Sequence, residues 1–206
     1  MSVLSSIAEK RRHGLLTQAM FRQFQRFGVH IIPYFVNLTR YSGKPVVDMP
    51  GVVFCLMPEK SIGAVAALEM SVGSKLAHPS DRLARGDRCF VVMRGDHILA
   101  TLWCSFDHAD LYGNARPLKG NEAYVYLVFV DPAERGLGLA PFIWLSTAAL
   151  LANEGVDTFV SSAEVFNRSA RRYQTKVGAV ASSLHVYARV GPVSFNPRVW
   201  VSASPR

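Results

Sequence analysis

Apolar and polar positions along the first fifty residues predict one helix followed by an extended segment. Residues 3–27 repeat apolar side chains at near-helical spacing with arginines and lysines between them, which is typical of an amphipathic helix. Residues 30–37 are apolar but contain Pro33, so we expect an edge strand or an extended arm, because proline cannot donate to a strand ladder. The turn-rich residues 41–50 mark a domain boundary.

The rest of the chain predicts an α+β domain built on a mixed sheet. The run 123–130 is dense in aromatic and β-branched residues and apolar on both faces, which predicts a central strand. Residues 94–97 predict a hairpin turn, and residues 77–86 and 106–121 are expected to be polar connections. The expected strands are 52–57, 88–93, 98–105, 123–130, 157–162, 183–190 and 198–202, and the expected helices are 58–73, 139–153 and 167–177.

Composition narrows the class of protein. Half of the 206 residues are apolar and 18% are charged, so the chain can bury a core and is not predominantly disordered. The longest apolar run, 123–130, is far shorter than the roughly 18 residues of a membrane span. Three widely spaced cysteines and a start that lacks the order of a secretory signal predict reduced thiols and a cytoplasmic location.

The net charge of +8 indicates an anionic partner. Residues 1–50 hold seven basic and two acidic residues, residues 51–159 hold nine and twelve, and residues 160–206 hold seven and one. A phosphate-bearing cofactor, a nucleic acid and a lipid surface all fit this balance. Nucleic acid is disfavoured because no base-stacking motif is found. The helix predicted over 3–27 fits either packing on the domain or peripheral contact with a membrane.

The residues that carry chemistry lie where the central strand meets the following helix. The segment 130–140 reads VDPAERGLGLA, a glycine-rich turn that opens directly into an apolar helix. Successive main-chain N–H groups in such a turn point into one concavity, and the helix N-terminus adds partial positive charge, so the segment predicts an anion site. Gly136 and Gly138 allow close approach of a ligand, and Arg135 adds a formal charge.

Other phosphate loops do not fit this spacing. No lysine follows the glycines, so the P-loop pattern is absent, and Pro141 occupies the third glycine position of a dinucleotide fingerprint. The stretch instead resembles the Arg/Gln-x-x-Gly-x-Gly/Ala signature of the GNAT superfamily of N-acetyltransferases, with Arg135, Gly138 and Ala140 in the defined positions. A second segment, Asn167-x-x-Ala170 followed by Lys176-Val177-Gly178, is similar to the family's next motif.

The resemblance covers residues 51–192 and implies a GNAT-like fold: a mixed, mostly antiparallel central sheet flanked by helices. Residues 1–50 would then be an N-terminal helical extension with its extended arm, and residues 193–206 a C-terminal strand and tail. The implied co-substrate is acetyl-CoA or another acyl-CoA, with no metal. The residues implied to bind it are Val128, Phe129 and Val130 along the pantetheine arm, Arg135, Gly136, Leu137, Gly138, Leu139 and Ala140 at the diphosphate, and Asn167 from the neighbouring strand.

The resemblance further implies an acyltransferase that moves acetyl to a primary amine by direct attack in a ternary complex. The acceptor would be a small-molecule or protein amine, and a homodimer is compatible with the family. A non-catalytic acyl-CoA-binding regulatory module of the same fold remains the alternative.

Two catalytic candidates stand out. Glu122 begins the central strand and is the candidate proton acceptor, with Glu164 as a second carboxylate near Asn167. Many family members keep a tyrosine as general acid at the helical position that holds Gln174 here, and Tyr173 lies about 100° away around the helix. Tyr173 and water therefore both stay open as the proton donor to the thiolate. The basic residues Arg168, Arg171, Arg172 and Lys176 fit either a solvated helix face or contact with the 3′-phosphate of coenzyme A.

Overall fold

A computed structural model describes residues 28–71 and 78–201. The amphipathic helix predicted over 3–27 lies outside the described residues, so its packing and its membrane contact stay predictions. The chain divides into two compact units. Unit 1 comprises 1–38, 111–114 and 162–206, and unit 2 comprises 39–110 and 115–161.

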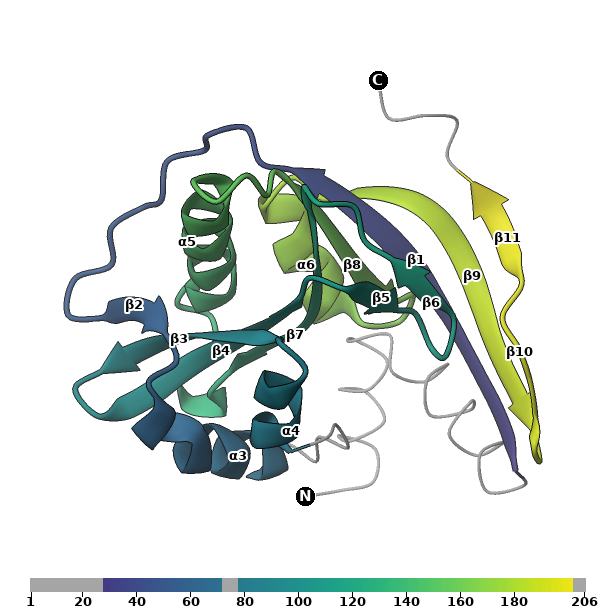
Figure 1. The fold of residues 1–206 in the computed structure, drawn as a ribbon, viewed down its shortest axis with the longest axis horizontal. Coiled ribbons are helices and arrows are strands. Elements are labelled where there is room, and N and C mark those ends of the chain that lie inside the picture. The colour runs from purple at the N-terminus through teal and green to yellow at the C-terminus, as the bar shows by residue number, and fades with distance from the viewer. Residues whose placement is uncertain (1–27, 72–77, 202–206) are drawn as a thin grey trace, which may run out of the picture. The chain divides into compact units, whose positions relative to one another are not determined.

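Unit 2 contains the strand predicted to be central. β7 (Glu122–Val130) pairs antiparallel with β4 (His97–Ser105) and parallel with the first residues of β8 (Thr158–Glu164). β4 continues antiparallel to β3 (Arg88–Arg94), which pairs with β2 (Val53–Leu56). The predicted central position of the run 123–130 is therefore confirmed, and this sheet is mixed and mostly antiparallel (Figure 1).

Helices cover both faces of this sheet. α5 (Leu139–Ala152) packs on β3, β4 and β7, while α3 (Ile62–Ser71), which follows the short turn η1 (Glu59–Ser61), and α4 (Pro79–Ala84) pack on the other side (Figure 1). All of β4 after His97 is buried, because apolar side chains on both of its faces meet a helix layer. On the α5 side, the Trp144 and Phe159 rings meet edge to face at 5.1 Å.

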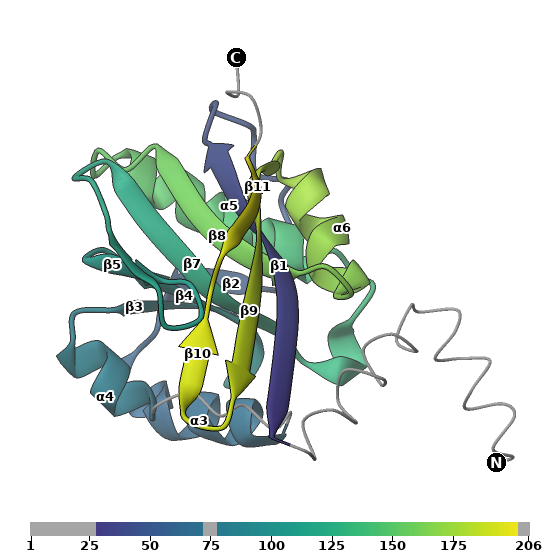
Figure 2. The same cartoon turned by 90° about the vertical axis from the view of Figure 1, so that its right-hand side faces the viewer.

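Unit 1 is a second group of strands with one helix. β1 (Val29–Arg40) and β10 (Val193–Phe195) flank β9 (Val180–Val190), and β11 (Arg198–Val201) also pairs with β9 (Figure 2). α6 (Arg168–Lys176) lies in the same unit, and its Arg171 guanidinium stacks 5.2 Å from the Phe35 ring. Within the described residues, no helix has the length and apolar character needed to cross a membrane.

The expectation that Pro33 would force an edge strand is wrong. β1 lies between β9 and β8 in the strand order, with Pro33 opposite Val186. The Pro33 carbonyl accepts a hydrogen bond from the N–H of Val165, the residue just past the end of β8. In a strand, the N–H and C=O of one residue point to the same side. The missing donor therefore falls where the neighbouring ladder ends and little pairing is lost.

Two segments expected to be irregular form regular structure. Residues 77–86 contain α4, whose proline in the first turn and Asp81 close by are ordinary helix-start signals. The connection 106–121 contains two short strands, β5 (His108–Asp110) and β6 (Ala115–Pro117), which pair antiparallel. None of these three elements has enough apolar residues to show a helical or strand period, so the sequence predicts polar connections there.

One buried ion pair joins α3 to α4. The side chains of Glu69 and Arg82 are 5% and 1% exposed and form a charge-assisted hydrogen bond. The indole N–H of Trp103 donates to the other carboxylate oxygen at 2.8 Å, and the guanidinium lies 3.9 Å from the centre of the same ring system. The pair therefore ties both helices to β4.

We expect Glu69→Ala to destabilise the protein by about 3–5 kcal/mol, because it leaves the buried Arg82 charge uncompensated. The matched control is Glu154→Ala, which breaks the ion pair between Arg88 and Glu154. Their side chains are 41% and 43% exposed, so this substitution should lower the free energy of unfolding by at most about 1 kcal/mol. Denaturant unfolding of the two variants measures both values. Equal losses would contradict a structural role for the buried pair.

Candidate functional site

The bend between β7 and α5 is held in place from both sides. The N–H of Asp131 donates to the Leu99 carbonyl at 2.9 Å, which continues the ladder with β4 past the end of β7. The Asp131 carboxylate then accepts from the N–H of Ala133 at 2.9 Å and caps the short helix η2 (Pro132–Glu134). On the other side, α5 begins with the buried Leu139. The two ends of the loop are therefore fixed by β7 and α5.

Two glycines shape the loop. Gly136 has φ of 90° and Gly138 has φ of 85°, which is the left-handed region that side chains disfavour. Gly138 is the N-cap of α5, and its carbonyl accepts from the N–H of Phe142. Nothing lies within 4 Å of where a Cβ would stand at either glycine, so the surface above the main chain is open to a ligand.

The main-chain donors of the loop have no acceptor among the residues that the structure describes. Among residues 28–71 and 78–201, no hydrogen bond is formed by the N–H groups of Gly136, Leu137, Gly138, Leu139 or Ala140. Pro141 has no N–H to contribute. Five unsatisfied donors at the positive end of a fourteen-residue helix are suited to bind an anion.

The charged residues of the loop support its shape. The Nε of Arg135 donates to the Val130 carbonyl at 3.3 Å, and its guanidinium lies 5.8 Å from the centre of the Phe129 ring. Glu134 forms two hydrogen bonds, of 2.9 and 3.2 Å, with Arg94 at the end of β3. The loop therefore keeps an exposed cation at its start and is tethered to the β3–β4 hairpin.

The end of β7 leaves main-chain groups available beside the loop. The parallel ladder with β8 covers Glu122 to Val125, whereas the antiparallel ladder with β4 continues to Val130. Val128 and Val130 are half-buried although the strand is central. The backbone groups of Val128, Phe129 and Val130 that face away from β4 are therefore outside the β7–β8 ladder, as a strand-like ligand arm would require.

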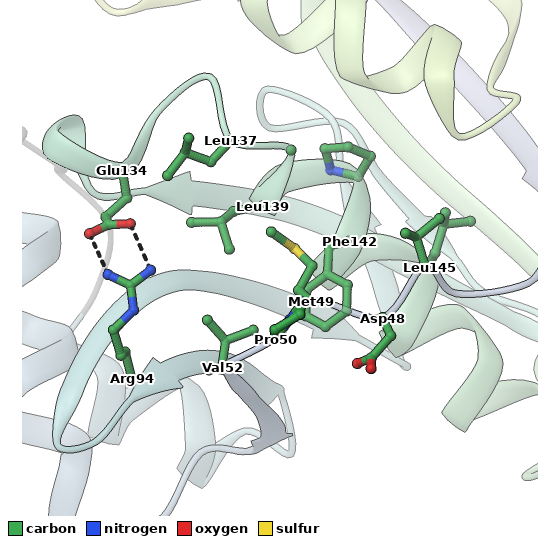
Figure 3. Close-up of a pocket in the computed structure, with 13 residues that line it drawn as sticks. Asp48, Met49, Pro50, Val52, Arg94, Glu134, Leu137, Leu139, Phe142 and Leu145 are labelled. Carbon is green, nitrogen blue, oxygen red and sulfur yellow. Dashed lines mark hydrogen bonds and ion pairs between the residues drawn. The ribbon is translucent and has the colours of Figure 1, made fainter.

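A pocket of about 470 Å³ adjoins the loop within unit 2 (Figure 3). Its lining is mostly apolar, and the Arg94–Glu134 pair stands at one side. The lining residues are Val47, Asp48, Met49, Pro50, Val52, Arg94, Glu134, Leu137, Gly138, Leu139, Pro141, Phe142 and Leu145. Three of the predicted cofactor-binding residues are thus shared between loop and pocket.

Asn167 belongs to unit 1 and has a structural role there. Its side-chain oxygen accepts from the N–H of Ala170 at 3.0 Å and caps α6. The side-chain amide nitrogen remains as the group that a ligand would meet, so the predicted contact with the pantetheine arm stays a prediction. The four basic residues of α6 are exposed, and Arg171 also donates to the Val165 carbonyl at 3.3 Å.

Glu122 is buried and partly engaged. One carboxylate oxygen, Oε2, lies 3.0 Å from both the main-chain N–H of Lys119 and the guanidinium of Arg116. No described residue hydrogen-bonds to Oε1. The carboxylate therefore closes the turn before β7 with one oxygen and can accept a proton with the other, which keeps its predicted catalytic role a prediction.

The structure gives Gln174 and Tyr173 different properties. Gln174 is 4% exposed, accepts from the Asn37 amide at 3.2 Å and donates to the Ser162 carbonyl at 3.5 Å, so it joins α6 to two strands of unit 1. Burial raises the pKa of the neighbouring Tyr173 phenol. A raised pKa makes the phenol a weaker proton donor, and the predicted role of Tyr173 as the proton donor to the thiolate stays a prediction.

Sequence reasoning missed the residues that the tertiary fold adds to the loop. The sequence predicts a hairpin turn at Arg94 and a boundary segment at Val47 and Met49, yet all three residues line the pocket beside Leu137. Each lies more than 35 residues from the loop, and no local motif signals such a contact.

Metal and thiol chemistry have little support in the part of the chain that the structure describes. No group of three His, Cys, Asp or Glu residues there could hold a metal ion. Asp107 and His108, which lie in the connection 106–121, pair with each other at 3.1 Å on the surface. Cys55, Cys89 and Cys104 are all free, as predicted, and burial raises the pKa of each thiol.

Comparison with known proteins identifies a family that this chain matches. The family model described as the acetyltransferase (GNAT) family matches residues 66–179, which is more than half of the chain. That range contains both the loop and α6. The search of curated proteins found no match.

Solved structures share the fold at low identity. A Drosophila protein is 12% identical with a TM-score of 0.59, over 87% of this chain and 58% of that one. A GNAT-family protein from Novosphingobium aromaticivorans is 22% identical with a TM-score of 0.59, over 79% and 66%. A GNAT-family acetyltransferase from Colwellia psychrerythraea is 12% identical with a TM-score of 0.58, over 89% and 72%. This chain thus spans less than two thirds of the first two proteins.

We expect Gly138→Glu to lower the affinity for acetyl-CoA at least tenfold, because it places bulk and negative charge among the loop donors. Gly155→Glu is the matched control: Gly155 has φ of 89° and open space, but lies in the turn after α5. Both variants carry the same backbone strain. Calorimetric titration with acetyl-CoA should show the loss in the first variant alone, and an unchanged affinity in Gly138→Glu would remove the loop from the binding site.

Proposed function

The chain belongs to the GNAT acetyltransferase family, and from this premise we propose that it is an acyl-CoA-dependent N-acyltransferase that moves acetyl from acetyl-CoA to a primary amine. The single observation that carries the proposal is the row of unsatisfied main-chain donors from Gly136 to Ala140. A diphosphate offers acceptors on two adjacent groups, which matches several consecutive N–H donors at a helix N-terminus better than a single carboxylate does. Metal is not required for this reaction.

The proposed site divides the co-substrate between two stretches of unit 2. The amides of residues 136–140 would hold the diphosphate, with Arg135 supplying charge beside it. The main chain of Val128, Phe129 and Val130 would bind the pantetheine arm along the side that the β7–β8 ladder leaves unused. When bound, acyl-CoA supplies an activated thioester carbonyl, and a main-chain N–H in this stretch would polarise the carbonyl oxygen.

The protein contributes to the transfer by positioning the amine against the thioester and by accepting a proton. The attacking amine must be neutral, so one proton leaves its ammonium form, and Glu122 Oε1 is the proposed acceptor, directly or through water. The amine nitrogen bonds to the carbonyl carbon as the carbon–sulfur bond breaks, its second proton leaves to water, and the thiolate takes a proton from water. This assignment follows from the structural bonds of Gln174, which leave no acid at the position where the family commonly keeps its tyrosine.

A regulatory module that binds acyl-CoA without turnover is the second candidate. It is favoured by one observation: in unit 1, the position where the family commonly keeps its acid is a buried amide that bonds to Asn37 and Ser162. A structural amide at this position can neither donate nor accept a transferable proton. Turnover measurements distinguish the two candidates.

We expect release of free coenzyme A from acetyl-CoA, followed with a thiol-reactive dye, only when a primary amine is present. A panel of mono-, di- and polyamines and lysine-containing peptides should include at least one acceptor, with mass spectrometry showing an added acetyl group. Tight acetyl-CoA binding with no turnover over the whole panel would favour the regulatory module. Absence of acetyl-CoA binding would overturn both candidates.

We expect Glu122→Gln to lower turnover about 100-fold with unchanged affinity for acetyl-CoA, because glutamine can still accept from the Lys119 N–H but cannot take a proton. Arg116→Gln is the control, since it breaks the ion pair at Glu122 and leaves the carboxylate in place. Tyr173→Phe should change turnover less than about threefold. Equal losses in Glu122→Gln and Arg116→Gln would make Glu122 a structural residue.

A further inference from the structure

The two compact units differ in net charge. Unit 1 holds twelve basic and two acidic residues, a net charge of +10, whereas unit 2 holds eleven basic and thirteen acidic residues. The described part of unit 1 contains one acidic residue, Glu164. Because charge of one sign attracts its opposite and repels its like, unit 1 favours an anionic partner and disfavours contact with the same unit of a second copy.

Unit 1 also exposes an apolar surface at one end of its sheet, where β1, β9 and β10 lie side by side (Figure 2). Val190 of β9 pairs with Val29 of β1 on one side and with Val193 of β10 on the other, so the three side chains share a face of the sheet. Ile31 and Phe195 lie two residues along their strands and therefore on the same face. Val190, Val193 and Phe195 are 55%, 51% and 59% exposed. We call these five residues the apolar end.

The opposite face of the same strand ends is polar. His30, Arg189 and Ser194 occupy one register position across the three strands, and Nε2 of His30 lies 3.1 Å from Nη2 of Arg189. The apolar side chains are therefore gathered on one face and bordered by polar groups. An exposed apolar patch with a polar border is typical of an interaction surface.

Basic side chains lie on the same face as the apolar end. Phe35 shares the face of Val29, because side chains alternate along β1. The Arg171 guanidinium of α6 lies 5.2 Å from the Phe35 ring, which places α6 on this face as well. Arg172 and Lys176 of α6 are exposed. One face of unit 1 thus combines exposed apolar side chains with exposed cations.

The chain enters this sheet at the apolar end. Gly28 immediately precedes Val29, and its carbonyl accepts a hydrogen bond from the N–H of Gly191 at 3.3 Å. Residues 1–27, which lie outside the described residues, hold five basic residues and one acidic residue. The basic amphipathic helix that the sequence predicts over 3–27 is therefore attached beside the exposed valines. Such a pattern is typical of helices that lie on a membrane surface.

We propose that this face of unit 1 is a docking surface for a membrane that contains anionic lipids. The apolar end would enter the headgroup region, while Arg172 and Lys176 would contact the anionic headgroups. A nucleic acid would pair with the cations but would gain nothing from exposed valines, and a second copy would bring together two units of like charge. The surface belongs to unit 1 alone, and the proposal does not depend on acyl transfer.

The test measures co-sedimentation of the full chain with vesicles of phosphatidylcholine alone and with vesicles of phosphatidylcholine and phosphatidylserine. The wild type should bind the anionic vesicles about tenfold more tightly than the neutral ones. Val193→Ser combined with Phe195→Ser should weaken binding to the anionic vesicles about tenfold. Arg172→Gln combined with Lys176→Gln should remove most of the preference for them. The control Val53→Ser changes a valine of β2 in unit 2 that is 61% exposed and should retain the binding.

Equal binding to neutral and anionic vesicles, or unchanged binding in the double serine variant, would overturn the proposal. Thermal unfolding of each variant identifies any loss that comes from misfolding, and Phe195→Leu, which keeps an apolar side chain, should retain most of the affinity. A dimer in sedimentation velocity that the double serine variant loses, without vesicle binding, would assign the surface to a second copy. Binding of a single-stranded RNA without vesicle binding would assign it to nucleic acid. Either result would overturn the lipid surface.

Discussion

The structure depends on one constraint at the bend between β7 and α5: main-chain N–H groups that nothing inside the described protein satisfies. Unpaired backbone donors are costly when they are buried, so folded chains usually pair them or expose them. Here they are exposed in a row, at the end of a helix whose dipole favours negative charge. Solvent-exposed donors of this kind cost little folding free energy, and their partial positive charge favours the binding of phosphate groups.

The rest of unit 2 keeps that bend rigid. β4 holds the start of the bend through the Asp131–Leu99 hydrogen bond, and the Arg94–Glu134 pair ties its middle to the β3–β4 hairpin. α5 is buried against β3, β4 and β7, so the last part of the loop cannot shift without opening the core. Preorganised donors bind more tightly because little conformational entropy is lost when the ligand arrives.

The surroundings of each ionisable side chain determine what that side chain can do. Glu122 and Glu164 are both half-buried or buried carboxylates, yet one closes a turn beside Arg116 and the other lies beside the Tyr112 hydroxyl. Tyr173 lies in a helix that resembles the family's motif, and burial raises the pKa of its phenol. The residue type alone therefore does not assign a role in either pair.

Local patterns in the sequence determined most of the elements and the loop. The apolar run 123–130, the glycines at 136 and 138 and the helix 139–153 are each specified within a few residues, because strand period, glycine conformation and helix capping are local properties. Only the tertiary structure decided which distant residues meet them: Pro33 inside a sheet, Arg82 buried against Glu69, and Tyr112 beside Glu164. Such contacts arise from the packing of elements far apart in the chain, and no pattern along the chain records them.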